Sequence, residues 1–147
     1  MIKAVQAFLA GLFFTFILDF FLFLGIHLHY INRHEIDVYY NVLFADHQNL
    51  MLYLAMTALL GYLTIYTDRP KQVALILAGL FAVVLTGLIP PVGDAVGSAL
   101  LMERDRTLYD HRYRYHGDVY YDGREAVWIY DDELQRMIKL MKKDLKQ

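Results

Sequence analysis

The sequence predicts a mainly α-helical membrane protein with three transmembrane helices and a small C-terminal extramembrane domain, made of a β-meander and an amphipathic helix. Two observations predict this fold class. The 147-residue chain is 57% hydrophobic with a mean hydropathy of +0.30, and its apolar residues gather in three long runs before residue 103. Residues 104–147 instead alternate tyrosines with charges. We therefore expect a membrane domain at 1–103 and a small soluble α+β tail at 104–147.

The first predicted transmembrane helix covers about 4–28. A helix needs about 20 apolar residues to cross a hydrocarbon core about 30 Å thick, and this run reaches that length by itself, with Asp19 and His27 as its strongly polar positions. It is longer than the apolar core of a signal peptide, which has about 7–15 residues, and no Ala-x-Ala cleavage pattern follows it. We expect the segment to be retained.

The second and third predicted helices cover about 48–66 and 72–89. Their central residues carry no charge, and each segment reaches a spanning length by including an interfacial residue, Gln48 or Gln72. Pro90-Pro91 ends the third helix, because the residue before a proline is displaced from helical geometry. Since proline is well tolerated in the first turn of a helix, 91–103 is expected as a proline-started helical extension, either at the membrane interface, re-entrant, or beyond the bilayer.

The tail shows the alternation of a strand over 109–115, a turn at 116–118, and a hairpin at Asp122-Gly123, a dipeptide that favours positive φ. After Asp131 or Asp132 as N-cap, apolar residues recur at steps of three and four, which predicts a final amphipathic helix. The residues on its apolar face are Leu134, Met137, Ile138, Met141 and Leu145.

Small residues form a stripe along the third predicted helix, at Ala74, Ala78, Ala82 and Thr86. Small side chains let helix backbones approach closely in lipid, where apolar attraction alone does not select a partner. Two interpretations remain open. The stripe closes a three-helix bundle within this chain, or it is a docking surface for other subunits.

Asp19 lies near the middle of the first predicted helix, where a charge costs about 2.5–3.5 kcal/mol on insertion scales. No Lys or Arg lies within the three predicted spans, so the expected partner is Thr15, Tyr53 or a threonine on a neighbouring helix, or a group on another subunit. The residue is a neutral, hydrogen-bonded aspartic acid that fixes helix contacts, a proton or ion relay, or an intersubunit contact.

Histidines cluster around the end of the first helix and the following loop, 29–47. Imidazole and carboxylate groups suit zinc, iron or copper, so a composite metal site is one hypothesis. The other is an interfacial belt of side chains with apolar bodies and polar tips. No cofactor is expected, although a transition metal is possible and haem is not favoured. The candidate ligands are His27, His34, Asp46 and His47, with His29 beside them.

Several function classes have little support. The chain has no cysteine, which excludes disulfides and thiolate chemistry, and its net charge of −2 offers no basic footprint for nucleic acid. It also lacks a nucleophile elbow and a phosphate-binding Gly-Lys-Ser/Thr loop. We therefore do not expect an enzyme, and no small-molecule substrate is indicated.

The expected function is that of an accessory or assembly subunit of a larger membrane complex, with the lipid bilayer and other membrane subunits as partners. Contacts would come from the small-residue stripe and from the tail residues Tyr113, Tyr121 and Trp128. The alternative is a metal- or proton-handling component that uses Asp19 and the histidine cluster. Positive charges in the short 67–71 loop favour a cytoplasmic N-terminus in a bacterial inner membrane, with the tail outside.

Overall fold

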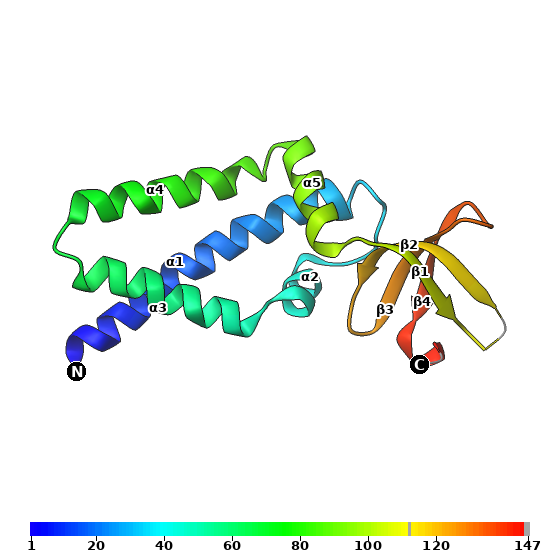
Figure 1. The fold of residues 1–147 in the computed structure, drawn as a ribbon, viewed down its shortest axis with the longest axis horizontal. Coiled ribbons are helices and arrows are strands. Elements are labelled where there is room, and N and C mark those ends of the chain that lie inside the picture. The colour runs from blue at the N-terminus through cyan, green and yellow to red at the C-terminus, as the bar shows by residue number, and fades with distance from the viewer. Residues whose placement is uncertain (112, 146–147) are drawn as a thin grey trace.

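The computed structural model describes residues 1–111 and 113–145, which form a helical part followed by a four-stranded sheet (Figure 1). The long helices are α1 (Ile2–Ile26), α3 (Leu50–Tyr66) and α4 (Pro70–Thr86). The short helices α2 (Tyr40–His47) and α5 (Pro90–Leu101) lie at the end of the long helices that is nearest the sheet. The N-terminus and the α3–α4 turn lie at the opposite end.

Among the described residues, one helix is long and apolar enough to cross a membrane by itself. It runs from Ile2 to Ile31, because a π-helix at His27–Ile31 continues α1. Its 30 residues correspond to about 45 Å, which exceeds a hydrocarbon core of about 30 Å. Two further candidate spans are bent pairs, α2 with α3 at 87° and α4 with α5 at 91°. The three expected spans are thus shown as one clear span and two that depend on the bent pairs.

Helices α1 and α3 pack in close contact through small residues. A Cβ added to Gly11 would lie 1.9 Å from the Thr57 carbonyl oxygen, and one added to Gly61 would lie 2.1 Å from that of Ala7. Helix α4 is much less embedded, since Val73 is its buried residue. Thr57 and Gly61 of α3 therefore make contacts within the chain.

The C-terminal end of α1 is the centre of the larger hydrophobic core. Ile26, Tyr30 and Ile31 have no exposed surface there. They pack with Leu43 of α2 and Leu101 of α5, and the sheet adds Tyr121 and Trp128 to the same cluster. The helices and the sheet therefore share one continuous core at their junction.

The sheet is a simple antiparallel meander in the order β1-β2-β3-β4. An isolated bridge between Asp110 and Leu145 joins the chain after β1 to the chain after β4, so the sheet curls toward closure. A second small core of Val119, Val127, Ile129 and Leu140 lies within the sheet. The strands are β1 (Glu103–Tyr109), β2 (Arg114–Asp122), β3 (Ala126–Asp131) and β4 (Arg136–Met141).

The predicted final amphipathic helix is wrong. Its residues form β4 and a short 3₁₀ turn at Lys142–Asp144. Asp131 does act as a cap, but for the β3–β4 turn: its Oδ1 accepts hydrogen bonds from the backbone N–H groups of Glu133 and Leu134 at 3.0 and 2.8 Å. The tail therefore forms four strands in place of the expected three strands and a helix.

Two turns of the tail differ from prediction, and one agrees. The predicted turn at 116–118 lies inside β2, where Gly117 has a φ of 156° and its added Cβ would lie 2.0 Å from the Tyr130 carbonyl oxygen. The β1–β2 connection instead falls within the predicted strand, at 110–113, of which residue 112 lies outside the described residues. The hairpin at Asp122-Gly123 is confirmed in position, with Gly123 N–H donating to the Ala126 carbonyl at 3.0 Å. Its connection covers 123–125, and neither Asp122 nor Gly123 has the positive φ that the dipeptide predicted.

Candidate functional site at the junction of helices and sheet

The π-helix His27–Ile31 points three polar side chains at three different parts of the chain. His27 Nε2 donates to the Val38 carbonyl at 3.1 Å, and His29 Nε2 donates to the Leu88 carbonyl at 2.8 Å. The Tyr30 hydroxyl donates to the Tyr120 carbonyl at 2.9 Å. Single π turns are rare in proteins overall, and those that occur are often found at functional sites. Here the π turn fastens the chain before α2, the α4–α5 corner and β2 to one helix end.

The remaining predicted metal ligands lie in separate contacts. His34 Nε2 is 3.3 Å from Asp94 Oδ1, and the same carboxylate pairs with Arg33 at 2.8 Å. The His47 ring packs on the Tyr121 ring at 5.0 Å between centroids. Within residues 1–111 and 113–145, no group of three or more His, Asp or Glu side chains is placed to hold a metal ion. The structure therefore does not bring His27, His34, Asp46 and His47 together.

Asp19 has a partner that the sequence reasoning missed. Its Oδ2 accepts a hydrogen bond from Gln48 Nε2 at 2.8 Å. Gln48 follows the last residue of α2, so the Asp19 carboxyl group of α1 contacts the α2–α3 connection instead of Thr15 or Tyr53. The sequence marked Gln48 only as an interfacial residue, and nothing in its spacing from Asp19 indicated the contact.

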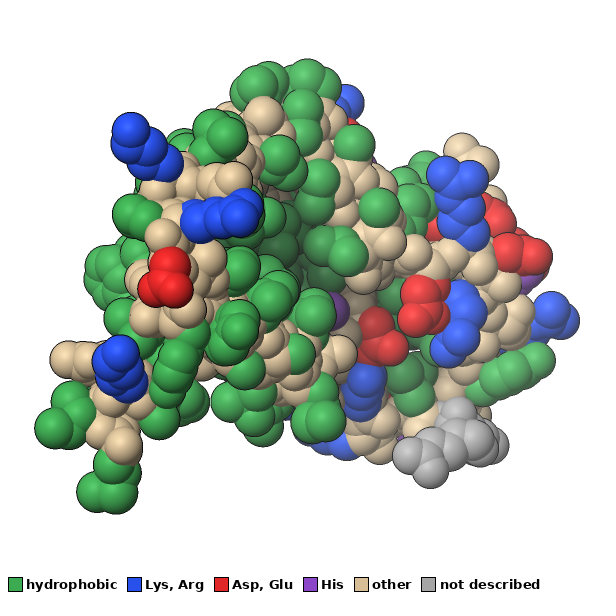
Figure 2. All heavy atoms as spheres, turned by 60° about the vertical axis from the view of Figure 1, so that its left-hand side comes forward, with side chains coloured by type: hydrophobic (Ala, Val, Ile, Leu, Met, Phe, Trp, Pro, Cys, Tyr) green, Lys and Arg blue, Asp and Glu red, His purple; other side chains and the backbone are tan. Residues whose placement is uncertain are grey.

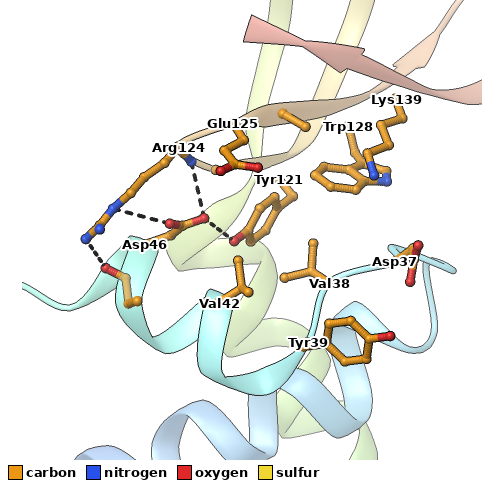
Figure 3. Close-up of a pocket in the computed structure, with 13 residues that line it drawn as sticks. Asp37, Val38, Tyr39, Val42, Asp46, Tyr121, Arg124, Glu125, Trp128 and Lys139 are labelled. Carbon is orange, nitrogen blue, oxygen red and sulfur yellow. Dashed lines mark hydrogen bonds and ion pairs between the residues drawn. The ribbon is translucent and has the colours of Figure 1, made fainter.

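Asp46 holds α2 against the β2–β3 hairpin. Its Oδ2 accepts the Tyr121 hydroxyl at 2.8 Å and the Arg124 backbone N–H at 3.2 Å, while Arg124 Nε lies 3.3 Å from Oδ1 (Figure 3). The Arg124 guanidinium also donates to the Ala45 carbonyl. Burial, and then the hydrogen bond to Asp46, raise the pKa of the Tyr121 hydroxyl, so it stays a protonated donor at neutral pH.

The three tail residues predicted to bind partners differ in accessibility. Tyr113 is 66% exposed, whereas Tyr121 and Trp128 are only 1% and 7% exposed. The two buried rings pack against each other, with 5.4 Å between ring centroids, inside the core shared with the helices. Of the three, Tyr113 alone can offer its side chain to another chain. Tyr121 and Trp128 stabilise the junction.

The small-residue stripe of α4 faces away from the rest of the chain. Ala74, Ala78, Ala82 and Thr86 are exposed, and a Cβ added to Gly79 would meet no atom within 4 Å. Helix α4 also exposes the larger side chains Leu75 and Val83, and the exposed side chains of α1 include four phenylalanines, Phe8, Phe13, Phe16 and Phe20. Figure 2 shows hydrophobic side chains over the helical part and charged ones at the α3–α4 end and over the sheet.

A pocket of about 370 Å³ lies between α2 with its preceding loop and the sheet (Figure 3). Charged side chains surround it: Asp37 before α2, Glu125 in the β2–β3 connection, and Lys139 on β4. Lys139 Nζ lies 4.8 Å from the centroid of the Trp128 ring. Sequence reasoning did not find this pocket, because its walls come from segments up to a hundred residues apart. Its apolar lining includes Val38, Val42, Ala126 and Trp128.

A scan against protein-family models, a search of curated proteins and a search of solved structures gave no match to this chain.

Proposed function

We propose that this chain is a three-span protein of a bacterial inner membrane that serves as an accessory or assembly subunit of a larger complex. In this proposal, α4 is the helix that contacts the partner. The observation that carries the proposal is the exposed small-residue stripe of α4, which lies among exposed aliphatic side chains such as Leu75 and Val83, while Val73 is the residue that α4 buries against its own chain.

The shape of the helical part supports three spans. Helices α3 and α4 have 17 residues each, about 25 Å, so each crosses most of a hydrocarbon core about 30 Å thick. Helices α2 and α5 meet them at 87° and 91° and lie at the same end of the bundle. If the long helices cross the bilayer, both short helices lie along its surface, beneath the sheet. Arg69 and Lys71 at the other end favour a cytoplasmic N-terminus.

The outward face of α4 is better suited to another helix than to lipid. In a membrane, association depends on close packing, and small residues allow backbones to approach. The α1–α3 contact within this chain is of that kind, with Gly11 and Gly61 on opposing backbones. Helix α4 offers the same type of surface without a partner among the described residues. A transmembrane helix of another subunit is therefore the expected occupant, and the exposed Tyr113 offers a second contact outside the membrane.

Affinity purification from the native membrane in mild detergent tests the subunit proposal. Ala78→Leu and Ala82→Leu place branched side chains on the proposed contact, and we expect both variants to lose co-purifying membrane subunits. Ala55→Leu is the matched control, since Ala55 is an exposed alanine on α3 and outside the stripe. Unchanged co-purification of both α4 variants, with the control also intact, would reject α4 as the partner helix.

Membrane topology is tested separately by labelling single cysteines, which is straightforward because the chain contains no cysteine of its own. Asp68→Cys lies in the α3–α4 turn and Asp132→Cys in the β3–β4 turn. A membrane-impermeant maleimide should label Asp132→Cys in spheroplasts and label Asp68→Cys only after lysis. Equal labelling of both positions before lysis contradicts the three-span arrangement, and the reversed pattern contradicts the orientation.

A further inference from the structure

We propose that the pocket between α2 and the sheet binds a zwitterionic headgroup in which a phosphate diester is joined to a primary ammonium, as in an ethanolamine phospholipid. This inference rests on the proposed three-span arrangement, which the cysteine labelling tests separately, and it does not depend on the partner that α4 binds.

The position of the pocket suits a headgroup. Because α2 meets α3 at 87°, α2 lies along the membrane surface when α3 crosses the bilayer, and the pocket lies between α2 and the sheet. This is the level of the lipid headgroups, just outside the hydrocarbon core. The volume of about 370 Å³ falls in the range of small-molecule sites, about 300–1,000 Å³. The apolar lining, Val38 and Val42 among it, suits the glycerol and ester carbons next to a headgroup.

The charges of the pocket favour a ligand that carries both signs. Asp46 and Arg124 are paired with each other and are not available. Lys139, Asp37 and Glu125 form no ion pair with any described residue, so the pocket presents one cation and two carboxylates. A simple anion would meet the two carboxylates, and a simple cation would meet Lys139, and such like-charge contacts are unfavourable. A phosphate near Lys139 with an ammonium near Asp37 or Glu125 satisfies both signs.

The contact between Lys139 and Trp128 indicates which cationic group fits. Quaternary ammonium groups are recognised by open aromatic faces. The Trp128 ring is already covered by Lys139 Nζ at 4.8 Å, and the Tyr121 ring is buried in the core (Figure 3). Tyr39 is then the one exposed aromatic ring among the lining residues, and a single ring does not form the aromatic cage that encloses a quaternary ammonium. Carboxylates instead accept hydrogen bonds, which a primary ammonium donates and a choline group does not. The pocket should therefore prefer ethanolamine to choline.

Trp128 makes the proposal directly measurable, because it is the single tryptophan of the chain and lines the pocket. The full chain in mild detergent is titrated with three short-chain lipids of equal acyl length, carrying ethanolamine, choline or glycerol headgroups. We expect a saturable change in tryptophan fluorescence with the ethanolamine lipid, and about tenfold weaker binding of the other two, the size expected for loss of one charge-assisted hydrogen bond. Soluble glycerophosphoethanolamine is titrated in parallel. Equal affinity for it identifies a free headgroup as the ligand, and tighter binding of the lipid identifies the membrane as the source.

The decisive variant combines Asp37→Asn with Glu125→Gln, because both side chains are exposed and neither forms an ion pair with a described residue. It should weaken binding of the ethanolamine probes about tenfold, with Asp132→Asn in the β3–β4 turn as its matched control. Lys139→Gln should weaken all three lipids, with Lys71→Gln at the opposite end of the bundle as control. The proposal is overturned by any of three results: no saturable response to the ethanolamine probes, equal affinity for the three headgroups, or wild-type binding by the double variant Asp37→Asn, Glu125→Gln.

Discussion

Replacement of a single glycine at the α1–α3 contact should measure how much the close approach of these helices stabilises the protein. In Gly11→Ala, the new Cβ would lie 1.9 Å from the Thr57 carbonyl oxygen and 2.9 Å from the Gly61 nitrogen. Since real Cβ atoms essentially never come closer than 3.0 Å, the helices must separate by at least about 1.1 Å (3.0 − 1.9) at this point. The atoms that have to move are backbone atoms, so no rotation of a side chain relieves the clash.

The magnitude follows from two opposing effects. Forcing an extra carbon into a packed contact costs about 1–3 kcal/mol, whereas replacing a mid-helix glycine by alanine stabilises the helix by about 0.5–1 kcal/mol. Gly79→Ala is the matched control, because Gly79 is also inside a helix but its added Cβ meets nothing within 4 Å. The helix-propensity effect is common to both variants, so their difference in unfolding free energy should equal the steric cost of about 1–3 kcal/mol.

The assay is an SDS titration of each variant in mild detergent, followed by far-ultraviolet circular dichroism. We expect Gly11→Ala to unfold at a lower SDS fraction than the wild type, and Gly79→Ala to unfold at the same or a higher one. A Gly11→Ala variant that is as stable as Gly79→Ala would refute the close α1–α3 contact.

Two further predictions concern the sheet and its junction with the helices. Tyr121→Phe removes the hydroxyl donor to the largely buried Asp46 and should loosen the sheet from α2 by about 1–3 kcal/mol, seen as faster hydrogen exchange in α2, with the exposed Tyr113→Phe as a silent control. Asp131 accepts backbone N–H groups of Leu134, His116 and Glu133, which lower the pKa of its carboxyl group. A lowered folded-state pKa means that this contribution is fully present above the unfolded value, about 3.9, and is lost as the pH falls below it. Thermal unfolding is therefore measured between about pH 5 and 2. The melting temperature of the wild type should decrease as the pH is lowered, and that of Asp131→Asn should decrease less steeply. Identical slopes of melting temperature against pH would contradict this role of Asp131.

The long helices could be predicted because apolar length is a local property of the sequence. The run at 4–28 and the two charge-free segments after it correspond to α1, α3 and α4. Helix α2 was missed, since its eight residues lie in a polar loop and are held by Leu43 packing into the shared core, a contact distant in sequence. The right-angle bend after α4 follows from Pro90, which the sequence did mark as the end of the third helix.

Strand β4 shows why the tail was harder to predict. Ile138 and Leu140 face the core inside the sheet, while Met137 and Met141 pack against the core shared with the helices. A strand that is apolar on both faces loses the alternation by which strands are recognised. The same residues also matched helical spacing by coincidence. The segment forms a strand because it pairs with the neighbouring strand β3, which is buried on both faces.

The candidate site was only partly predictable for a similar reason. Sequence reasoning selected Asp46, Tyr121 and Trp128 individually, because a carboxylate near histidines and the aromatic residues of the tail stand out. It assigned them to metal binding or partner contacts, whereas Asp46 bonds to Tyr121 across 75 positions of the chain. Lys139 carried no signal at all, since exposed charges are ordinary on a surface.

The outer strand of the sheet limits how this protein can join an assembly. Many subunits associate by donating a strand to an open sheet edge, where unpaired backbone groups accept it. Here β1 begins with the charged run Glu103–Arg106, and the Asp110–Leu145 bridge draws the two edges of the sheet together. Strand addition is therefore disfavoured at the charged start of β1 and at the bridged ends of the sheet. In the proposed assembly, contacts would then use side-chain surfaces, so their specificity could be altered by point substitutions without disturbing the backbone pairing of the tail.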